Sequence, residues 1–356
     1  MAGGNIIEVS DMAVVKTVTG TKQLFSLEDS WIIKTVGTNK QSLVLGDGSG
    51  IKKGGNLYVF PMGDSPILII SSSKLTINLV RMVLASPVRI DWGDGVVEEI
   101  SAGTISSKSH TYPSLASRTV RFYGESAALT VLDVKNNLLK SIDISGSTAM
   151  TEFICIGCAL TSLDITQNTA LKYLDCSSNS LTSLDVSQNE ALEHLDCGYN
   201  KLTTINVNSN PVLSILRCTN NQMKSTLNVS GRTALTELDC HSNSIGSLNV
   251  SGCTMLIWLY CYSNKIYSLN TAGCVALVHI ECYDNSFTSL SVSGLSNLKI
   301  LRCSYNSFIT NNTAVTNMAN SLPVRSSNAP GSLSITNTSA QAVIQSICDA
   351  KNWVIY

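Results

Sequence analysis

The sequence predicts a mostly β solenoid with few helices, in which short coils stack their strands into one parallel sheet behind smaller all-β modules. The first observation is a 21-residue period, with one step of 22, in eight cysteines: Cys155, Cys176, Cys197, Cys218, Cys240, Cys261, Cys282 and Cys303. The second is an asparagine three residues after each of them from Cys176 onward. The third is an alternation of apolar and polar residues around each cysteine, which is typical of a strand with one buried face. Repeats of this length indicate coils that share one continuous core.

Residues 1–70 are expected to form a small β-rich N-terminal domain of unknown family. The segments VVKTV at residues 14–18 and IIKTV at residues 32–36 are near copies, and Gly46-Asp47-Gly48 separates further short apolar runs. Valine, isoleucine and threonine favour strands and glycine favours turns, so the pattern predicts a domain built of hairpins.

Residues 72–125 carry a second all-β module. The string W-G-D-G at residues 92–95 is followed by H-T-Y at residues 110–112 and then by a strand-like run at residues 120–124. This arrangement resembles the PKD-like β-sandwich, a small immunoglobulin-like module of surface proteins. The resemblance implies two packed layers of antiparallel strands ahead of the repeats.

Residues 126–310 hold the repeats, in nine registers. One unit, residues 171–191, reads LKYLDCSSNSLTSLDVSQNEA. It resembles the leucine-rich repeat, whose core is L-x-x-L-x-L-x-x-N/C-x-L. The closer resemblance is to the short Cys-containing leucine-rich repeats of surface proteins from Bacteroidetes-type bacteria. The asparagine column is expected to turn inward after the strand, where its amide can pair backbone groups that the turn leaves unsatisfied.

Residues 311–356 are expected to form an α/β C-terminal cap of the solenoid, with a β-α-β order. Residues 331–335 are typical of a strand, residues 339–350 of a helix that begins with Ser339 as its N-cap, and residues 353–355 of a final strand. A solenoid needs such a cap to cover its terminal apolar face.

The repeat cysteines lie on core columns, so they are predicted to be small buried apolar residues. Strands in register are about 4.8 Å apart, somewhat more than the Cβ–Cβ distance of about 3.8 Å in a disulfide. Cys253 and Cys274, also 21 residues apart, are the pair for which a bridge stays open. Cys155 and Cys158 form a C-x-x-C pair, but both fall on core columns. No cofactor and no metal site is predicted.

The composition excludes several classes of protein. The chain has 356 residues and a formal net charge of −1, so it offers no basic field for nucleic acid. Hydrophobic residues make up 44% and charged residues 14%, which excludes intrinsic disorder. The sequence contains no run of 18 apolar residues, so no membrane span is predicted. The N-terminal residues also lack the basic and apolar segments of a leader peptide.

Three outward columns of the repeat are assigned to the concave face of the sheet, and they are rich in aromatic, histidine and arginine side chains. Tyrosine, tryptophan and arginine are the usual anchors of recognition sites. The predicted partner-binding residues are Tyr173, His194, Arg217, His241, Trp258, Tyr260, Tyr262, His279, Tyr283 and Arg302. The alternative is that aromatic neighbours only stabilise the sheet, by about 0.2–1 kcal/mol per pair.

No catalytic residue is predicted, because the sequence has no G-x-S-x-G, P-loop, G-x-G-x-x-G or H-E-x-x-H motif. Asp91, Asp94 and His110 are the one cluster with a possible metal or catalytic interpretation. Their position around a glycine-rich turn favours turn chemistry and structural hydrogen bonds instead.

The sequence therefore predicts a non-enzymatic recognition or adhesion protein that binds a protein or glycan partner through the concave face. The family resemblance implies an extracellular or cell-surface location in bacteria. The lack of a leader peptide in this chain favours an alternative, an exterior structural protein of a bacteriophage or virus-like particle, docked through the N-terminal domain. The oligomeric state is left open.

Overall fold

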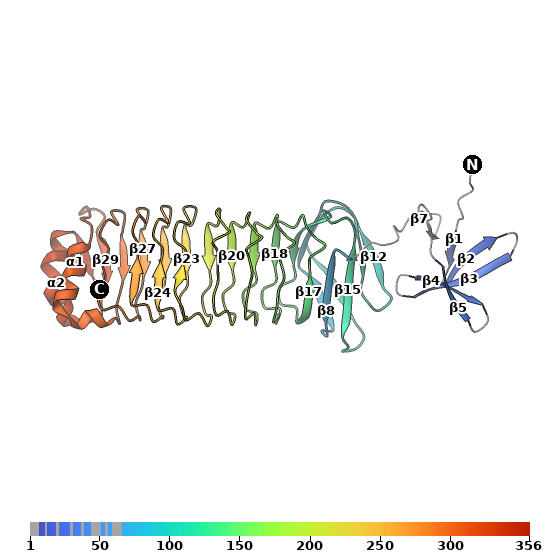
Figure 1. The fold of residues 1–356 in the computed structure, drawn as a ribbon, viewed down its shortest axis with the longest axis horizontal. Coiled ribbons are helices and arrows are strands. Elements are labelled where there is room, and N and C mark those ends of the chain that lie inside the picture. The colour runs from blue at the N-terminus through green and yellow to red at the C-terminus, as the bar shows by residue number, and fades with distance from the viewer. Residues whose placement is uncertain are drawn as a thin grey trace. The chain divides into compact units, whose positions relative to one another are not determined.

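The structure is a computed structural model that describes residues 66–356 throughout and, of residues 1–65, only the backbone of the strands. The chain divides into two compact units, Met1–Ser65 and Pro66–Tyr356. Strands dominate both units. The helices of the described residues, α1 (Asn312–Ser321) and α2 (Thr338–Ala350), lie at the C-terminal end of the second unit (Figure 1).

The seven strands of the first unit form one sheet, in the order β5-β4-β3-β2-β1-β6-β7. Consecutive strands from β1 to β5 pair antiparallel, as hairpins do, whereas β1 and β6 pair in parallel. The two near-copy segments lie in β2 and β4, which both pair with β3, while Gly46-Asp47-Gly48 lies outside the described residues. The strands are β1 Ile7–Ser10, β2 Ala13–Val18, β3 Thr21–Glu28, β4 Trp31–Val36, β5 Asn39–Leu43, β6 Ile51–Lys53 and β7 Asn56–Tyr58.

The second unit begins with short, mostly antiparallel strands around an apolar core. One sheet has the order β12-β11-β15-β8-β17, β9 pairs with β14, and β13, β10 and β16 begin the long sheet of the unit. Ile90, Trp92 and Phe122 are fully buried in a core that continues into the solenoid. The strands are β8 Leu68–Ser72, β9 Thr76–Leu79, β10 Arg81–Leu84, β11 Val88–Asp91, β12 Val97–Ile100, β13 Gly103–Ile105, β14 Lys108–Thr111, β15 Arg118–Tyr123, β16 Leu129–Asp133 and β17 Leu139–Asp143.

These first strands are continuous with the solenoid. Strand β10 pairs antiparallel with β16, and β16 pairs in parallel with β18 (Glu152–Ile154) in the next coil. Strand β17 pairs with β8, so a second sheet also joins the two parts. The sheets therefore cross the expected boundary between residues 125 and 126, because the first coil needs partners that cover its open end.

The coils stack their strands in parallel and so supply most of a thirteen-stranded sheet, which Figure 1 shows as a row running toward the helices. Leu174 pairs with Leu195, and Leu195 with Leu216, so each coil returns in register. Each of these leucines is fully buried, and its strand neighbours face outward. The later strands are β19 Tyr173–Asp175, β20 His194–Asp196, β21 Ile215–Arg217, β23 Glu237–Asp239, β25 Trp258–Tyr260, β27 His279–Glu281 and β28 Ile300–Arg302.

The second half of the coil forms a strand in the first coil, where it is β17, and in three later coils. The three later strands are β22 (Leu227–Asn228), β24 (Ser247–Asn249) and β26 (Ser268–Asn270), which pair in parallel as a separate sheet. Residues 184–186, at the corresponding place of an earlier coil, form no strand.

Asn179 shows how one side chain joins two coils. Its Nδ2 donates to the carbonyl oxygens of Cys155 at 2.8 Å and Cys176 at 2.9 Å. Its Oδ1 accepts from the backbone N–H groups of Cys158 at 3.1 Å and Leu160 at 2.9 Å. The predicted inward asparagine column is therefore confirmed, because buried backbone groups need such partners.

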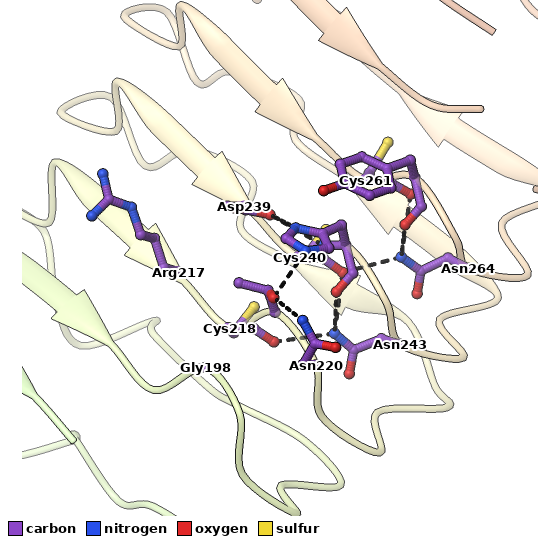
Figure 2. Close-up of polar contacts among 12 residues, drawn as sticks. Gly198, Arg217, Cys218, Asn220, Asp239, Cys240, Asn243, Cys261 and Asn264 are labelled. Atoms are coloured by element: carbon purple, nitrogen blue, oxygen red, sulfur yellow. Dashed lines mark hydrogen bonds and ion pairs between the residues drawn. The ribbon is translucent and has the colours of Figure 1, made fainter. Parts of the chain in front are cut away.

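The same contacts recur along the solenoid. In Figure 2, the amide of Asn243 reaches the carbonyl oxygens of Cys218 and Cys240, each at 3.1 Å. The residue just before the asparagine has a left-handed backbone, as Ser242 does with φ of 54°. This conformation turns the chain so that the next side chain points inward.

All twelve cysteines lie in the described part of the chain, and all are buried and free of disulfides. Cys253 Sγ donates to the carbonyl oxygen of Val229 at 3.1 Å, and Cys274 Sγ to that of Val250 at 3.0 Å. Asn210 makes the equivalent bond to the carbonyl 24 residues before it. The predicted role as small buried residues is confirmed, and the thiols of Cys253 and Cys274 act as donors instead of forming a bridge.

Beyond the coils, the chain adds a 3₁₀ turn at Ser307–Thr310, helix α1, strand β29 (Gly331–Ser334), helix α2 and strand β30 (Trp353–Ile355). Strand β29 pairs in parallel with β28, and β30 with β29, so the long sheet gains two strands after the last repeat. The apolar end of the last coil is covered in this way.

The predicted N-cap of α2 is wrong by two residues. Asn337, not Ser339, is the N-cap, and its Oδ1 accepts the backbone N–H of Ala340 at 3.1 Å. Asparagine is as good an N-cap as serine, and Ser339 already lies in the first turn of the helix.

Candidate functional site

The outward side chains of β18 to β29 and of the turns that follow them form one surface, which we call the strand face. Register pairing aligns these side chains into the columns that the sequence predicts. The columns are Tyr173, His194, Ile215, Glu237, Trp258, His279 and Ile300; Asp175, Asp196, Arg217, Asp239, Tyr260, Glu281 and Arg302; and Ser177, Gly198, Thr219, His241, Tyr262, Tyr283 and Ser304.

Aromatic rings stack along these columns. In the third column, the ring centroids of His241 and Tyr262 are 4.3 Å apart, and those of Tyr262 and Tyr283 are 4.5 Å apart, with nearly parallel planes. In the first column, Tyr173 and His194 stack at 4.3 Å. The spacing follows from neighbouring strands about 4.8 Å apart. Neighbouring rings therefore cover each other's faces and leave the ring edges outward.

Trp258 and its neighbours form the densest part of the strand face. The residue Trp258 is 40% exposed, more than the other large apolar residues of its column. Tyr260, two residues along the same strand, meets His279 of the next strand edge to face at a centroid distance of 5.5 Å. Aromatic and imidazole groups from two adjacent strands are thus gathered around one exposed indole.

Both arginines of the strand face are paired with glutamates. Arg217 Nε lies 2.8 Å from an oxygen of Glu237 on the next strand. Glu281 accepts at 2.9 Å from both Arg302 Nη1 and His279 Nε2. Both arginines are thus neutralised locally, whereas Asp175 and Asp196 accept hydrogen bonds from the turns that follow them.

His241 is held on both sides of its ring. Its Nδ1 lies 2.5 Å from Asp239 Oδ1, and its Nε2 lies 3.2 Å from Thr219 Oγ1. In Figure 2, the side chain of Arg217 extends away from this group of contacts. The network orients the imidazole so that it can stack on Tyr262.

Two titratable groups of β20 are partly desolvated. Burial, together with the charge of Arg217, lowers the pKa of His194, whose Nε2 has no hydrogen-bond partner in the described residues. Burial raises the pKa of Asp196 to about 6, although its Oδ1 accepts the Gly198 N–H at 3.0 Å. This part of the strand face therefore favours a neutral imidazole beside a carboxylate that holds its proton more tightly than usual.

The structure brings together most of the predicted binding residues but not all. His241, Trp258, Tyr260, Tyr262, His279 and Tyr283 form one group on β25, β27 and adjoining turns, with Arg302 on the next strand. The stacked pair of Tyr173 and His194 lies apart from this group, beyond β21 and β23. Arg217 lies between them on β21.

The sequence prediction left out two kinds of residue. Tyr199 and Tyr305, in the turns beside the third column, are 59% and 68% exposed. Ser332 and Ser334 on β29 continue the first two columns, because they pair with Ile300 and Arg302. The two tyrosines could have been found from the sequence, because each lies one residue beyond the predicted third column. The two serines could not, because they lie outside the 21-residue period.

Asp94 and His110 form a structural contact in the first part of the unit. Asp94 Oδ2 lies 2.7 Å from His110 Nε2, the His110 ring stacks on Trp92 at 4.8 Å, and the Tyr112 hydroxyl donates to the Trp92 carbonyl at 2.8 Å. Asp91 Oδ1 accepts the N–H two residues later, at 2.9 Å, as in a turn. These contacts are the structural hydrogen bonds around a turn that the sequence predicts.

The described residues hold neither a cluster of metal-ligating side chains nor a helix that could span a membrane. Within residues 66–356, no group of three or more His, Cys, Asp or Glu side chains is placed to hold a metal ion. None of the helices in the described part of the chain combines the length and hydrophobicity that a bilayer span requires.

The parallel coils, their buried leucine columns and their inward asparagines define a leucine-rich-repeat solenoid. No protein-family model matches the chain, and no curated protein matches its sequence. Among solved structures, it is similar to the functional domain of InlJ from Listeria monocytogenes, which includes a cysteine ladder. The identity is 30% over 63% of this chain and 52% of that one, with a TM-score of 0.43.

Two further solved structures show the same kind of likeness. YopM of Yersinia pestis, a leucine-rich effector protein, is 19% identical over 49% of each chain, with a TM-score of 0.42. An internalin C2 of Listeria monocytogenes is 17% identical over 65% of this chain and 81% of that one, with a TM-score of 0.38. The chain spans about half the length of the InlJ and YopM structures that it matches.

Proposed function

We propose that this chain is a non-enzymatic recognition protein that binds a protein partner through the strand face. The observation that carries the proposal is the 40% exposure of Trp258 beside a group of aromatic side chains on the same and the next strand. Aromatic residues with an apolar body and a polar edge are the commonest anchors of protein interfaces.

Sheet stabilisation explains only part of this arrangement. The stacked rings of His241, Tyr262 and Tyr283 shield one another, so their packing alone accounts for them. Trp258 and Tyr305 differ, because both leave much of their surface in water. Each exposed apolar Å² forgoes about 25 cal/mol of burial, which a partner would recover on binding.

The charge pattern of the strand face indicates the kind of partner. Arg217 and Arg302 are each paired with a glutamate of a neighbouring strand. The positive charges are therefore already neutralised, so a partner is matched by shape, aromatic contacts and hydrogen bonds rather than by a strong negative charge. A folded protein surface of mixed polarity meets this requirement.

The test compares two variants of the intact chain on an array of purified proteins. Trp258→Ala combined with Tyr260→Ala is expected to weaken binding to the proteins that the unmodified chain captures by at least tenfold, because hot-spot aromatics carry most of the binding free energy. Far-UV circular dichroism and the urea midpoint check that the fold is retained.

Tyr267→Ala is the matched control, since Tyr267 is 63% exposed but precedes β26 of the second sheet. It should leave binding unchanged. The proposal fails if the array captures no protein, or if the Tyr267 variant loses binding while the Trp258 and Tyr260 variant keeps it.

The location that fits this role is the cell surface or the extracellular space. The exterior of a bacteriophage or virus-like particle stays an alternative, with the seven-stranded N-terminal sheet as the docking element. Immunogold labelling of producing cells and of particles released from them separates the two locations.

A further inference from the structure

The ring stack of the third column ends at Tyr283, and the reason lies in the next two strands. In the next coil, Ser304 occupies the position of the third column that corresponds to Tyr283. The register of β28 and β29 places Thr336 next to Ser304 in the same column. In the second column the residue after Arg302 is Ser334. Small hydroxyl side chains thus replace rings and long chains at this end of the strand face.

Because these side chains are small, they leave a depression of about 480 Å³, which we call the hydroxyl slot. Ser304, Ser334 and Thr336 line it together with Tyr283, Tyr305 and Arg302. The hydroxyl oxygens of Ser304 and Ser334 lie 3.4 Å apart. Ligand-binding clefts have volumes of roughly 300–1,000 Å³, so the slot has the size of a small-molecule site.

The lining combines two chemistries. Tyr262 stacks on one face of the Tyr283 ring. The opposite face of that ring lines the slot, because no further ring follows in the column. The serine and threonine hydroxyls can each donate one hydrogen bond and accept two. The Arg302 side chain is 52% exposed and engages Glu281 through Nη1, so further N–H groups of its guanidinium meet solvent.

We propose that the hydroxyl slot binds one monosaccharide unit of a glycan. A pyranose ring has an apolar C–H face, which would pack on Tyr283, and a rim of hydroxyls, which would exchange hydrogen bonds with Ser334, Thr336 and Arg302. An aromatic side chain would also stack on Tyr283, but it would remove the slot hydroxyls from water without giving them partners. The site goes beyond the proposed function, because it takes a small ligand whether or not a protein binds near Trp258.

Saturation-transfer NMR on the intact chain tests the proposal directly. The probes are D-glucose, D-galactose, D-mannose, L-fucose, N-acetylglucosamine and N-acetylgalactosamine, with N-acetyltyrosinamide as the aromatic probe. At least one sugar is expected to receive saturation, with a Kd on the order of 1 mM because the slot is shallow. The aromatic probe should receive little.

Two variants locate the bound sugar. Ser304→Tyr should continue the ring stack from Tyr283, fill the slot and weaken sugar binding at least tenfold. Ser334→Ala should weaken it severalfold by removing one hydroxyl while leaving the slot open, and it stays informative if Ser304→Tyr fails to fold. Ser177→Tyr, a serine at the far end of the same column, is the matched control and should bind sugar normally.

The proposal is overturned if no sugar binds, if Ser304→Tyr and Ser334→Ala both bind sugar like the unmodified chain, or if only N-acetyltyrosinamide binds. The last result would assign the slot to an aromatic side chain of a protein. The Trp258→Ala and Tyr260→Ala variant should keep sugar binding even where it loses protein binding, so failure of one proposal can be told from failure of the other.

Discussion

The Nδ2 atom of Asn200 donates a hydrogen bond to the carbonyl oxygen of Cys176 in the preceding coil, at 3.0 Å. The same nitrogen lies 3.2 Å from the carbonyl oxygen of Cys197 in its own coil, and Oδ1 accepts the Leu181 N–H at 2.9 Å. One buried side chain therefore satisfies backbone groups of two coils. Stacking depends on this polar column as well as on the buried leucines, because an unpaired backbone group inside the core is costly.

Replacing Asn200 should destabilise the solenoid in proportion to the donors that are lost. Asn200→Ala leaves the Leu181 N–H without its acceptor and takes one of two amide donors from each of the Cys176 and Cys197 carbonyls, which keep Asn179 and Asn221, so the free energy of unfolding should fall by about 1–3 kcal/mol. Asn200→Cys should lose less, since Cys158 in the same column donates through Sγ to the carbonyl oxygen of Val134 at 3.1 Å. Urea unfolding followed by circular dichroism measures both losses.

Asn208→Ala provides the control, because Asn208 is exposed on the surface of a neighbouring turn. Its free energy of unfolding should stay within about 0.5 kcal/mol of the unmodified chain. Equal losses for the alanine and cysteine variants at position 200 would show that the thiol does not replace the amide.

The thiols should be unreactive in the folded chain. Burial raises the pKa values of Cys218, Cys240 and Cys261, so that these groups stay protonated and out of reach at pH 8. Ellman's reagent is expected to titrate almost no thiol in native buffer and twelve after unfolding in guanidinium without reductant. Ten equivalents would reveal one disulfide and contradict the free state of Cys253 and Cys274.

Asp196 should make the chain less stable at neutral pH than at acid pH. Its pKa of about 6 in the fold exceeds the ordinary value of 3.8 for an aspartate, so the fold prefers the protonated form. That contribution to stability is fully present below pH 3.8 and is lost as the pH rises through 6. Asp196→Asn, which keeps an acceptor for the Gly198 N–H, should raise the free energy of unfolding by about 2–3 kcal/mol at pH 7 and by little at pH 4.

Asp185→Asn is the matched control and should act in the opposite direction. Asp185 is exposed, and hydrogen bonds from Ser187 lower its pKa, so its ionised form stabilises the fold at pH 7. Urea unfolding at pH 4 and pH 7 tests both variants. A loss of stability at pH 7 in the Asp196 variant would mean that the contacts of the carboxylate outweigh the cost of its burial.

The repeat columns could be predicted because a strict period leaves one way to stack the coils. Once Cys176 and Cys197 occupy equivalent places, Tyr173 must pair with His194 and Asp175 with Asp196, as they do. The inward turn of Asn179 followed from the same alignment, since a polar side chain on a core column needs buried partners.

The hydroxyl slot could not be predicted in this way. Strand β29 begins at Gly331, after a 3₁₀ turn and a helix, so no period counted from Arg302 arrives at Ser334. The pairing of β10 with β16 likewise joins segments that share no repeat. Such pairings are decided by which apolar surfaces remain open once the coils have stacked.

The amino-acid sequence alone therefore specified the coil, its register and the side chains that face outward, because a local period of buried and exposed positions encodes all three. Folding in three dimensions decided which of those side chains touch. The stack of Tyr262 on Tyr283, the burial of Asp196 and the depression beside Ser304 each depend on a neighbour contributed by another coil or by the cap. Desolvation and ring packing arise only when segments distant in sequence meet, so they cannot be read from one repeat.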